Sequence, residues 1–305
     1  MEHARVVAEG LRFPEGPVVL PDGTLLVCEM AAGFVARVDP ATGAVERIAE
    51  TGGGPNGAAL GPDGALYVCN NGGWPMLELG TLLVPRDVNQ DERYVGGSIQ
   101  RVDLDTGEVD TVYEGLRSPN DIVFDADGGF WFTDYGKQRE RDEDRGAVCY
   151  GRPDGSLLHE AARPLLRPNG IGLLPGGRAL VVAETPTGHV WRWDIEEPGR
   201  PAKARPFDHG GRLVAGVGGL QLFDSLAVEA DGRICVATLL DAGITVISPD
   251  GAEVEHVPLP AHCADPLPTN LCFAGDDMRT AYVTLSAGGR VMACRWPRPG
   301  LRLAF

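Results

Sequence analysis

The sequence predicts an all-β protein, a six-bladed β-propeller with a polar metal site on its axis. Two observations carry this prediction. Six polar residues each stand seven positions before a tight-turn residue, and a short apolar run fills each interval. After each turn comes a second β-rich run, and no long segment of helical periodicity interrupts the pattern. We expect a single domain over residues 1–305.

The first apolar runs are the candidate innermost strands of the blades. They lie at 18–20, 58–60, 122–124, 171–173, 226–228 and 271–273. The turns that follow them lie at 22, 63, 127, 176, 231 and 277, so that successive turns are 41, 64, 49, 55 and 46 residues apart. A four-stranded blade takes about 40 to 50 residues. Asp-Gly between two β-rich runs is also a strong hairpin signal, because such a turn needs positive φ.

Two further strands complete each blade. The second runs lie at 25–28, 66–69, 130–133, 179–182, 234–237 and 281–284. The third runs lie at 35–38, 99–102, 148–150, 190–193, 244–247 and 291–296, each followed by another turn and a fourth strand. The pattern leaves the closure of the ring open, because either residues 5–8 or residues 301–305 could form the outer strand of the last blade.

Strand alternation places the longest connections on the face where the innermost strands begin. The connection of about 72–96 in blade 2 carries Trp74, Met76 and several leucines, which favours a lid over the axis, although an interaction surface fits the same pattern. A charged connection follows at 137–145. A glycine-rich connection at 203–221 joins blades 4 and 5 on the same face.

The six polar residues would meet on the axis if the six segments close into a ring. They comprise two carboxylates and four amides: Glu15, Asp224, Asn56, Asn120, Asn169 and Asn270. A site made only of oxygen ligands suits hard cations such as calcium, magnesium or manganese. Two negative charges would balance one divalent ion, whereas buried carboxylates without a cation would be costly. Six ligands exceed one compact shell, so some members must have other roles.

A second polar series lies at the ends of the second runs, on the same face. Its members are Glu29, Asn70, Asp134, Glu184, Thr238 and Thr284. We expect this series to provide supporting contacts, a second cation site or contacts to a substrate. The residues favoured for such contacts are Glu29, Asn56, Arg117, Asp134, Glu184 and Asn270.

Composition and charge exclude several classes of function. The net charge of −16 argues against nucleic acid and anionic membranes as partners. No apolar stretch has the length of a membrane span, and the first residues do not resemble a secretory signal. Seven cysteines without a CxxC pair indicate free thiols and a cytoplasmic protein. The sequence holds no signal for oligomeric state.

Four motifs resemble those of the gluconolactonase-like family, which includes regucalcin (senescence marker protein) and luciferin-regenerating enzyme. They are residues 13–17 (FPEGP), 118–121 (SPND), 167–170 (RPNG) and 223–228 (FDSLAV). The resemblance runs over essentially the whole chain. It implies a six-bladed propeller, a divalent ion in the axial channel and hydrolysis of small lactones. The implied metal ligands are Glu15, Asn169 and Asp224, with Asn120 at the metal or the substrate.

The resemblance implies one divalent ion, with calcium as the expected ion and magnesium, manganese or zinc as alternatives. In the mechanism we expect, the ion polarises the lactone carbonyl and orients a water molecule. Asp224 is the candidate base, and Asn120 would help to hold the developing oxyanion. The chain departs from the motifs of the family's sugar-lactone enzymes in two places. Arg117 stands three rather than two residues before Asn120, and Ser225 replaces the usual glycine after Asp224. Both departures bear on the choice of a sugar-acid substrate more than on the metal.

Two other functions fit the pattern. Strictosidine synthase-like proteins share the six-bladed architecture, so a metal-free lyase or condensing enzyme is one alternative. The other is a metal-binding or protein-binding propeller without turnover, in which the apolar connection of blade 2 is an interaction patch. The carboxylates and amides at the axial positions favour the metal-dependent hydrolase.

Overall fold

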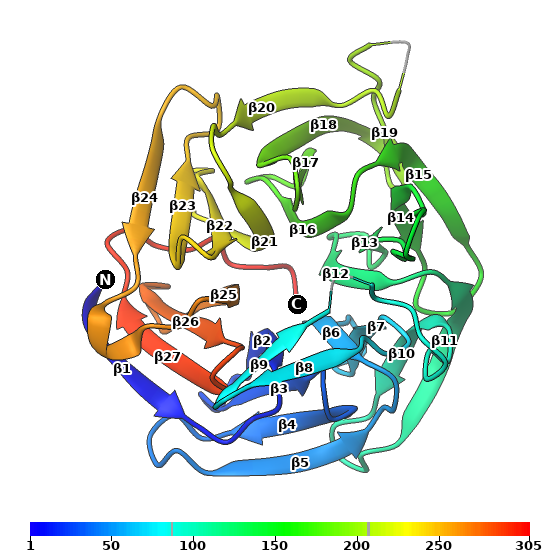
Figure 1. The fold of residues 1–305 in the computed structure, drawn as a ribbon. Coiled ribbons are helices and arrows are strands. Elements are labelled where there is room, and N and C mark those ends of the chain that lie inside the picture. Colours follow the sequence, from blue (N-terminus) through cyan, green and yellow to red (C-terminus); the bar gives the residue numbers. More distant parts are fainter. Residues whose placement is uncertain (87, 206–207) are drawn as a thin grey trace.

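Six antiparallel sheets stand around a central axis like the blades of a propeller (Figure 1). This computed structural model describes residues 1–86, 88–205 and 208–305. The predicted all-β, six-bladed architecture is confirmed. No helix in these described ranges has the length and apolar character needed to cross a membrane.

The first three blades follow one another along the chain, with their strands in order from the axis outwards. Blade 1 consists of β2 (Pro14–Val19), β3 (Leu25–Glu29), β4 (Phe34–Val38) and β5 (Val45–Glu50). Blade 2 consists of β6 (Pro55–Leu60), β7 (Leu66–Asn70), β10 (Gly97–Val102) and β11 (Val109–Leu116). Blade 3 consists of β12 (Pro119–Phe124), β13 (Phe130–Asp134), β14 (Gly146–Gly151) and β15 (Leu158–Leu165).

The other three blades complete the ring. Blade 4 consists of β16 (Pro168–Leu173), β17 (Ala179–Glu184), β18 (His189–Glu197) and β20 (Arg212–Gly216), with the short β19 (Arg200–Pro201) also on β18. Blade 5 consists of β21 (Leu222–Val228), β22 (Ile234–Leu239), β23 (Gly243–Ile247) and β24 (Val254–Pro258), and a 3₁₀ turn (Ala261–Cys263) follows. Blade 6 consists of β25 (Pro268–Ala274), β26 (Thr280–Leu285), β27 (Arg290–Arg295) and β1 (Glu2–Ala8).

The hydrophobic core is divided among the contacts between neighbouring blades. Trp131 of β13 and Trp193 of β18 belong to one buried cluster shared by blades 3 and 4. Leu26 of β3 and Val68 of β7 belong to another, shared by blades 1 and 2. Because both faces of each blade are covered, the second strands are apolar at almost every position rather than at alternate ones.

The innermost strands share a start that orients the residues near the axis. Five of them, β2, β6, β12, β16 and β25, begin with proline, which fixes φ and needs no partner for an N–H group. In all six, the pairing with the second strand shifts by one residue just after this start. Such a β-bulge redirects the side chains beside it. The residue after each proline therefore occupies a repeated position at the top of the channel.

The N-terminal strand closes the ring. Strand β1 pairs with β27, and its Val7 and Ala8 are buried in the cluster between blades 6 and 1. Residues 301–305 instead turn inwards beneath the axis, where the C-terminus appears at the centre of Figure 1. The alternative that the sequence left open is thus decided in favour of the N-terminal segment.

We expect deletion of residues 1–8 to destabilise the protein far more than deletion of residues 301–305. The first deletion exposes the edge of β27 and removes buried Val7 and Ala8, at a cost of roughly 3–5 kcal/mol in the free energy of unfolding. The second removes mostly exposed side chains. Urea unfolding of the two truncated proteins measures the difference. Equal losses would contradict closure by β1.

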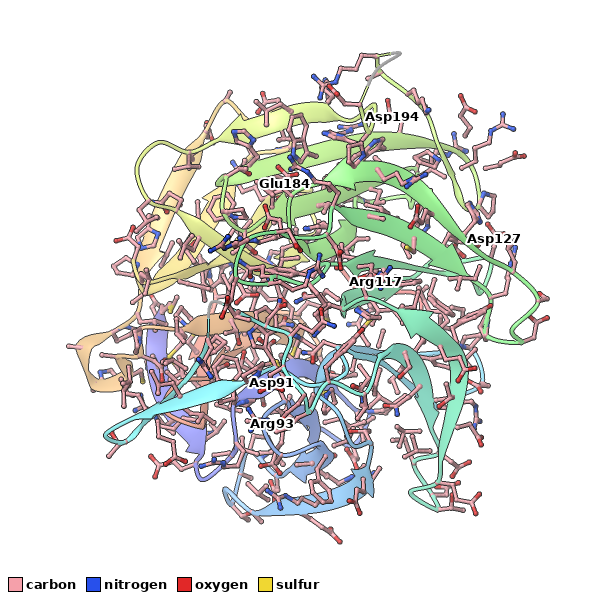
Figure 2. The ribbon with its side chains drawn as sticks, turned by 45° about the vertical axis from the view of Figure 1, so that its right-hand side comes forward. Asp91, Arg93, Arg117, Asp127, Glu184 and Asp194 are labelled. Carbon is pink, nitrogen blue, oxygen red and sulfur yellow. The ribbon has the colours of Figure 1, made fainter. Side chains whose placement is uncertain are left out.

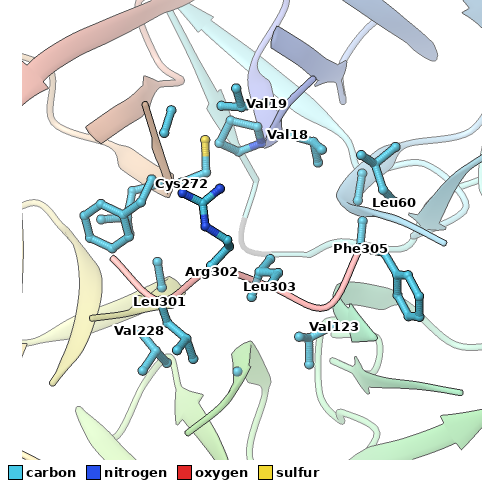
Figure 3. Close-up of a pocket in the computed structure, with 18 of the residues that line it drawn as sticks. Val18, Val19, Leu60, Val123, Val228, Cys272, Leu301, Arg302, Leu303 and Phe305 are labelled. Atoms are coloured by element: carbon cyan, nitrogen blue, oxygen red, sulfur yellow. The ribbon is translucent and has the colours of Figure 1, made fainter. Parts of the chain in front are cut away.

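The C-terminal segment lines a cavity of about 710 Å³ at the lower end of the axis (Figure 3). Apolar side chains from the lower ends of the innermost strands line it, including Val18, Leu60, Val123 and Val228. Leu301 donates its backbone N–H to the carbonyl of Val228 at 2.8 Å. The inner end of the cavity reaches Asp121 and Asn270, next in sequence to the residues at the top of the channel.

Two of the long connections contain strands that the sequence pattern did not predict. The connection of 72–96 carries a hairpin of β8 (Met76–Leu79) and β9 (Leu82–Pro85); its residue 87 lies outside the described ranges. The glycine-rich connection expected between blades 4 and 5 at 203–221 was placed too broadly, because residues 212–216 form β20, the outer strand of blade 4. Residues 206 and 207 of that connection also lie outside the described ranges.

Candidate functional site

Five of the six predicted ring residues occupy the same position in their blades. Each follows the first residue of an innermost strand or, in blade 5, Phe223, and each is buried: Glu15, Asn56, Asn120, Asn169 and Asp224. In blade 6 the pairing places Thr269 at this position, because Pro268 pairs with Leu285 as Pro119 does with Asp134. The prediction that Asn270 belongs to the ring was therefore wrong by one residue.

The ring holds buried oxygen atoms without a hydrogen-bond partner. They are Oε2 of Glu15 and the Oδ1 atoms of Asn56, Asn120 and Asn169. Within the described ranges, every unpartnered buried carboxylate or amide oxygen belongs to this ring. Buried polar atoms are rarely left unpaired, so these four acceptors make the ring a candidate site for a cation.

The electrostatics of the ring point the same way. Burial raises the pKa of Glu15 well above its usual value, and the nearby Asp224 carboxylate raises it further. Burial, with a smaller contribution from Asp121, raises the pKa of Asp224 to about 7, although a hydrogen bond from Asn169 opposes this rise. Two acidic groups that disfavour each other's charge would both be stabilised as carboxylates by one cation.

Neighbouring side chains orient the amides and carboxylates of the ring. The Nδ2 atom of Asn169 donates to Oγ1 of Thr185 at 3.1 Å, which leaves Oδ1 of Asn169 unpartnered. The Nδ2 atom of Asn56 contacts Sδ of Met30 at 3.5 Å. Thr269 hydrogen-bonds to the Glu15 carboxylate, which lowers the pKa of Glu15. These contacts engage the amide nitrogens of Asn56 and Asn169 and leave their Oδ1 atoms unpartnered.

The carboxyl group of Asp121 lies beneath the ring and was not assigned a role from the sequence. Burial raises the pKa of Asp121 to about 7, and its Oδ1 accepts the backbone N–H of Ile122 at 3.1 Å. A Cβ atom on Gly57 would lie 2.3 Å from this oxygen, so blade 2 needs glycine there. The signal in the sequence was the contrast with blades 1, 2 and 4, which have Gly16, Gly57 and Gly170 at this position.

The acidic residues at the ends of the second strands hold the backbone that leads into the ring. Glu29 accepts the N–H of Arg12 at 2.9 Å, and Glu184 accepts that of Leu166 at 2.7 Å. Asp134 accepts the N–H groups of Arg117 and Ser118 at 2.9 and 2.7 Å. Asn70 accepts the N–H of Gly54 in the same way. These contacts favour a supporting role for the series rather than direct contact with a ligand.

Two further residues of the predicted site differ in their exposure. The side chain of Arg117 is 70% exposed and lies 3.9 Å from Asp144. Asn270 is buried, and its Oδ1 accepts the N–H of Leu271 at 2.7 Å. Figure 2 shows Arg117 and Glu184 towards the middle of the molecule, whereas Asp127 and Asp194 lie at its periphery. Arg117 is therefore an exposed residue paired with Asp144, whereas Asn270 lines the lower cavity.

We expect Asp134→Ala to lower the free energy of unfolding by roughly 2–4 kcal/mol, because three backbone N–H groups lose their acceptor. Asp127→Ala, at the exposed turn of the same hairpin, is the matched control, and we expect a change within about 0.5 kcal/mol. Guanidinium unfolding measures both. Equal effects would show that the Asp134 contacts add nothing to the stability of blade 3.

Comparison with known proteins finds a matching family model, relatives in sequence and similar solved structures. The family model described as "SMP-30/Gluconolactonase/LRE-like region" matches residues 13–287. A gluconolactonase from Zymomonas mobilis is 25% identical over 306 residues, covering 92% of this chain and 78% of that protein. Diisopropyl-fluorophosphatase from Loligo vulgaris is 26% identical over 322 residues, covering 96% and 92%. Among solved structures, a calcium-binding regucalcin from Agrobacterium tumefaciens superposes with a TM-score of 0.74 at 16% identity, covering 99% and 98% of the two chains.

Proposed function

The chain belongs to the SMP-30/gluconolactonase/LRE-like family, and we propose that it hydrolyses small lactones at the axial ring with the help of one divalent cation. The observation that carries the proposal is the set of unpartnered oxygens on Glu15, Asn56, Asn120 and Asn169. A related gluconolactonase and a calcium-binding structural neighbour support the reaction class and the ion.

The residues present fit a hard cation. Glu15, Asn120, Asn169 and Asp224 would hold it, and they supply two negative charges and amide oxygens, the ligands that calcium prefers. Within the described ranges, no group of three or more His, Cys, Asp or Glu side chains is placed to hold a metal ion, so the proposed site depends on amide oxygens beside its two carboxylates. We propose calcium as the ion, with magnesium, manganese and zinc as alternatives.

When bound, the ion would polarise the lactone carbonyl as a Lewis acid. The protein would contribute the acid–base chemistry. A carboxylate oxygen of Asp224 accepts a proton from the attacking water, whose oxygen forms a bond to the carbonyl carbon. The tetrahedral oxyanion accepts a hydrogen bond from Nδ2 of Asn120. Collapse then breaks the ring C–O bond, and the proton returns to the leaving alkoxide to give the hydroxy acid.

The test is hydrolysis of a lactone panel by protein stripped with a chelator and then given calcium, magnesium, manganese or zinc. We expect activity to be absent after stripping and restored by one ion, with acid release followed in a pH-stat. The panel includes glucono-δ-lactone and dihydrocoumarin. Because diisopropyl-fluorophosphatase is a relative, it also includes diisopropyl fluorophosphate as a second candidate substrate class.

Two outcomes would replace the proposal. Full activity in the stripped protein would favour a metal-free enzyme such as a lyase or condensing enzyme. Metal binding without turnover of any panel member would favour a binding protein, with the hairpin of β8 and β9 as its interaction surface.

A further inference from the structure

The blade 2 insertion folds across the upper face of the ring. Leu83 of β9 donates its backbone N–H to the carbonyl of Ala287 in blade 6 at 2.8 Å. The side chain of Leu83 belongs to a buried cluster with Phe13 and Met30 of blade 1. Met30 in turn contacts the ring amide of Asn56. In Figure 1, β8 and β9 lie over the inner strands of blades 1 and 2. The insertion therefore spans from blade 2 to blade 6 beside the candidate metal ligands.

A buried lysine from blade 3 lies at the base of this insertion. The side chain of Lys137 is among the largest fully buried ones, with 1% of the residue exposed. Its Nζ donates to the carbonyls of Gly73 at 3.2 Å and Asn89 at 3.1 Å, and it lies 4.4 Å from the ring centroid of Tyr94. All three partners belong to the insertion, so one ammonium group holds both of its ends.

The backbone next to Lys137 reinforces this attachment. Gln138 donates its N–H to Oδ1 of Asn89 at 2.7 Å, and Asn89 donates its N–H to the carbonyl of Gln138 at 3.2 Å. Burial lowers the pKa of Lys137 to about 8, so the group still carries its proton at neutral pH. Among the described residues, no carboxylate lies at hydrogen-bonding distance of the Lys137 ammonium group. A charge buried in this way adds little to global stability, so its contacts act mainly on the geometry of the loop.

A continuous series of contacts leads from Lys137 to the ring. The carbonyl of Gly73 that Lys137 binds immediately precedes Trp74, whose ring packs on Tyr135 with centroids 5.4 Å apart. The Tyr135 hydroxyl hydrogen-bonds to Thr185, and Asp224 is close enough to raise the pKa of Tyr135. Thr185 accepts the amide of the ring residue Asn169. Displacement of Trp74 would therefore alter the space above Asn169 and Asp224.

We propose that Lys137 is a positioning residue: it fixes the described parts of the insertion, residues 72–86 and 88–96, as a lid and sets Trp74 against Tyr135 as a wall of the substrate site. This inference rests on the proposed lactone hydrolysis at the ring below. Lys137 itself touches no ring residue in the contacts described above. It acts through Gly73 and Trp74, and its loss should weaken substrate binding more than the chemical step.

The test is Lys137→Met, which keeps the aliphatic chain and removes the ammonium group. We expect amide hydrogen exchange of the lid amides, including those of Leu83 and Asn89, to become at least about tenfold faster, because the lid opens locally. On the best lactone of the panel we expect KM to rise about tenfold with kcat within about threefold of wild type. Arg298→Met is the matched control, because it removes a cation that pairs with Glu229 away from the ring.

The exchange measurement needs no activity, so it decides the lid contact even if no lactone is hydrolysed. Unchanged exchange in Lys137→Met would overturn the proposal, as would faster exchange with an unchanged KM. The same rise in KM in Arg298→Met would also overturn it. If Lys137→Met does not fold, Trp74→Leu provides the test: we expect the same rise in KM, and a wild-type KM in that variant would contradict the proposal.

Discussion

Replacement of Asp224 by asparagine will lower kcat for lactone hydrolysis by at least about a hundredfold while the protein stays folded. Asparagine keeps the shape of the side chain and one oxygen but cannot accept a proton from water. It also removes one of the two negative charges that would balance the cation. Steady-state kinetics at saturating calcium measures the loss. A variant that binds the ion and turns over lactone at the normal rate would eliminate Asp224 as the base.

The stability of the same variant separates a catalytic role from a structural one. In the metal-free protein at pH 8, we expect Asp224→Asn to be more stable than wild type by roughly 2–4 kcal/mol, because the buried negative charge is gone. With calcium bound, we expect the wild type to be more stable than Asp224→Asn. Asp231→Asn, at the exposed turn between β21 and β22, is the control and should change neither activity nor this order. A metal-free variant less stable than wild type would contradict the account.

The metal-free protein will lose stability, relative to the Glu15→Gln/Asp224→Asn variant, as pH rises from about 4 to about 7. Burial raises the folded-state pKa values of Glu15 and Asp224 above their unfolded values near 4. Over this window the folded protein binds more protons than the unfolded chain, so the contribution of these groups is complete at low pH and is lost through the folded pKa. The loss that comes from Asp224 should level off above its folded-state pKa of about 7.

Calcium should oppose this loss, and more strongly at pH 8 than at pH 5, because binding needs both carboxylates ionised and displaces their protons. Urea unfolding of wild type and the double variant at the two pH values, with chelator and with calcium, measures both effects. The variant corrects for the other titrating groups. If the difference in free energy of unfolding between the two proteins does not change with pH, the ring carboxylates are not the groups whose protonation is linked to folding.

Much of the fold was predictable because propeller blades repeat a local pattern. The innermost strands, their hairpin turns and the second strands follow from alternating turn signals and apolar runs. Closure was not predictable from local pattern, because residues 5–8 and 301–305 are both short, partly apolar segments. Long-range pairing with β27 decides between them. Strand β20 was missed for a related reason: its glycine-rich surroundings predict a loop, and only the edge of β18 makes it a strand.

The positions of the ring residues were predicted by counting seven residues back from the turn after each innermost strand. This count is correct where the innermost strand has the length found in most blades. In blade 3, Ile122 is the first paired residue after the β-bulge, and the pairing ends two residues later, where Phe124 pairs with Phe130. In blade 6 it continues to Ala274 with Thr280, three residues after Leu271, so the count lands on Asn270 instead of Thr269. Lys137 was missed because a charged run predicts a solvated loop. Its burial depends on an insertion from another blade.

Calorimetric titration of chelator-stripped protein with calcium, beside the Glu15→Gln/Asp224→Asn double variant, tests the central claim most directly. The claim is that the unpartnered oxygens of the axial ring form one cation site. We predict one ion per wild-type chain, proton release that grows as the buffer is made more acidic from pH 8 to pH 6, and no binding in the variant. Undiminished binding in the variant, or no binding to the wild type by calcium or another divalent ion, would contradict it.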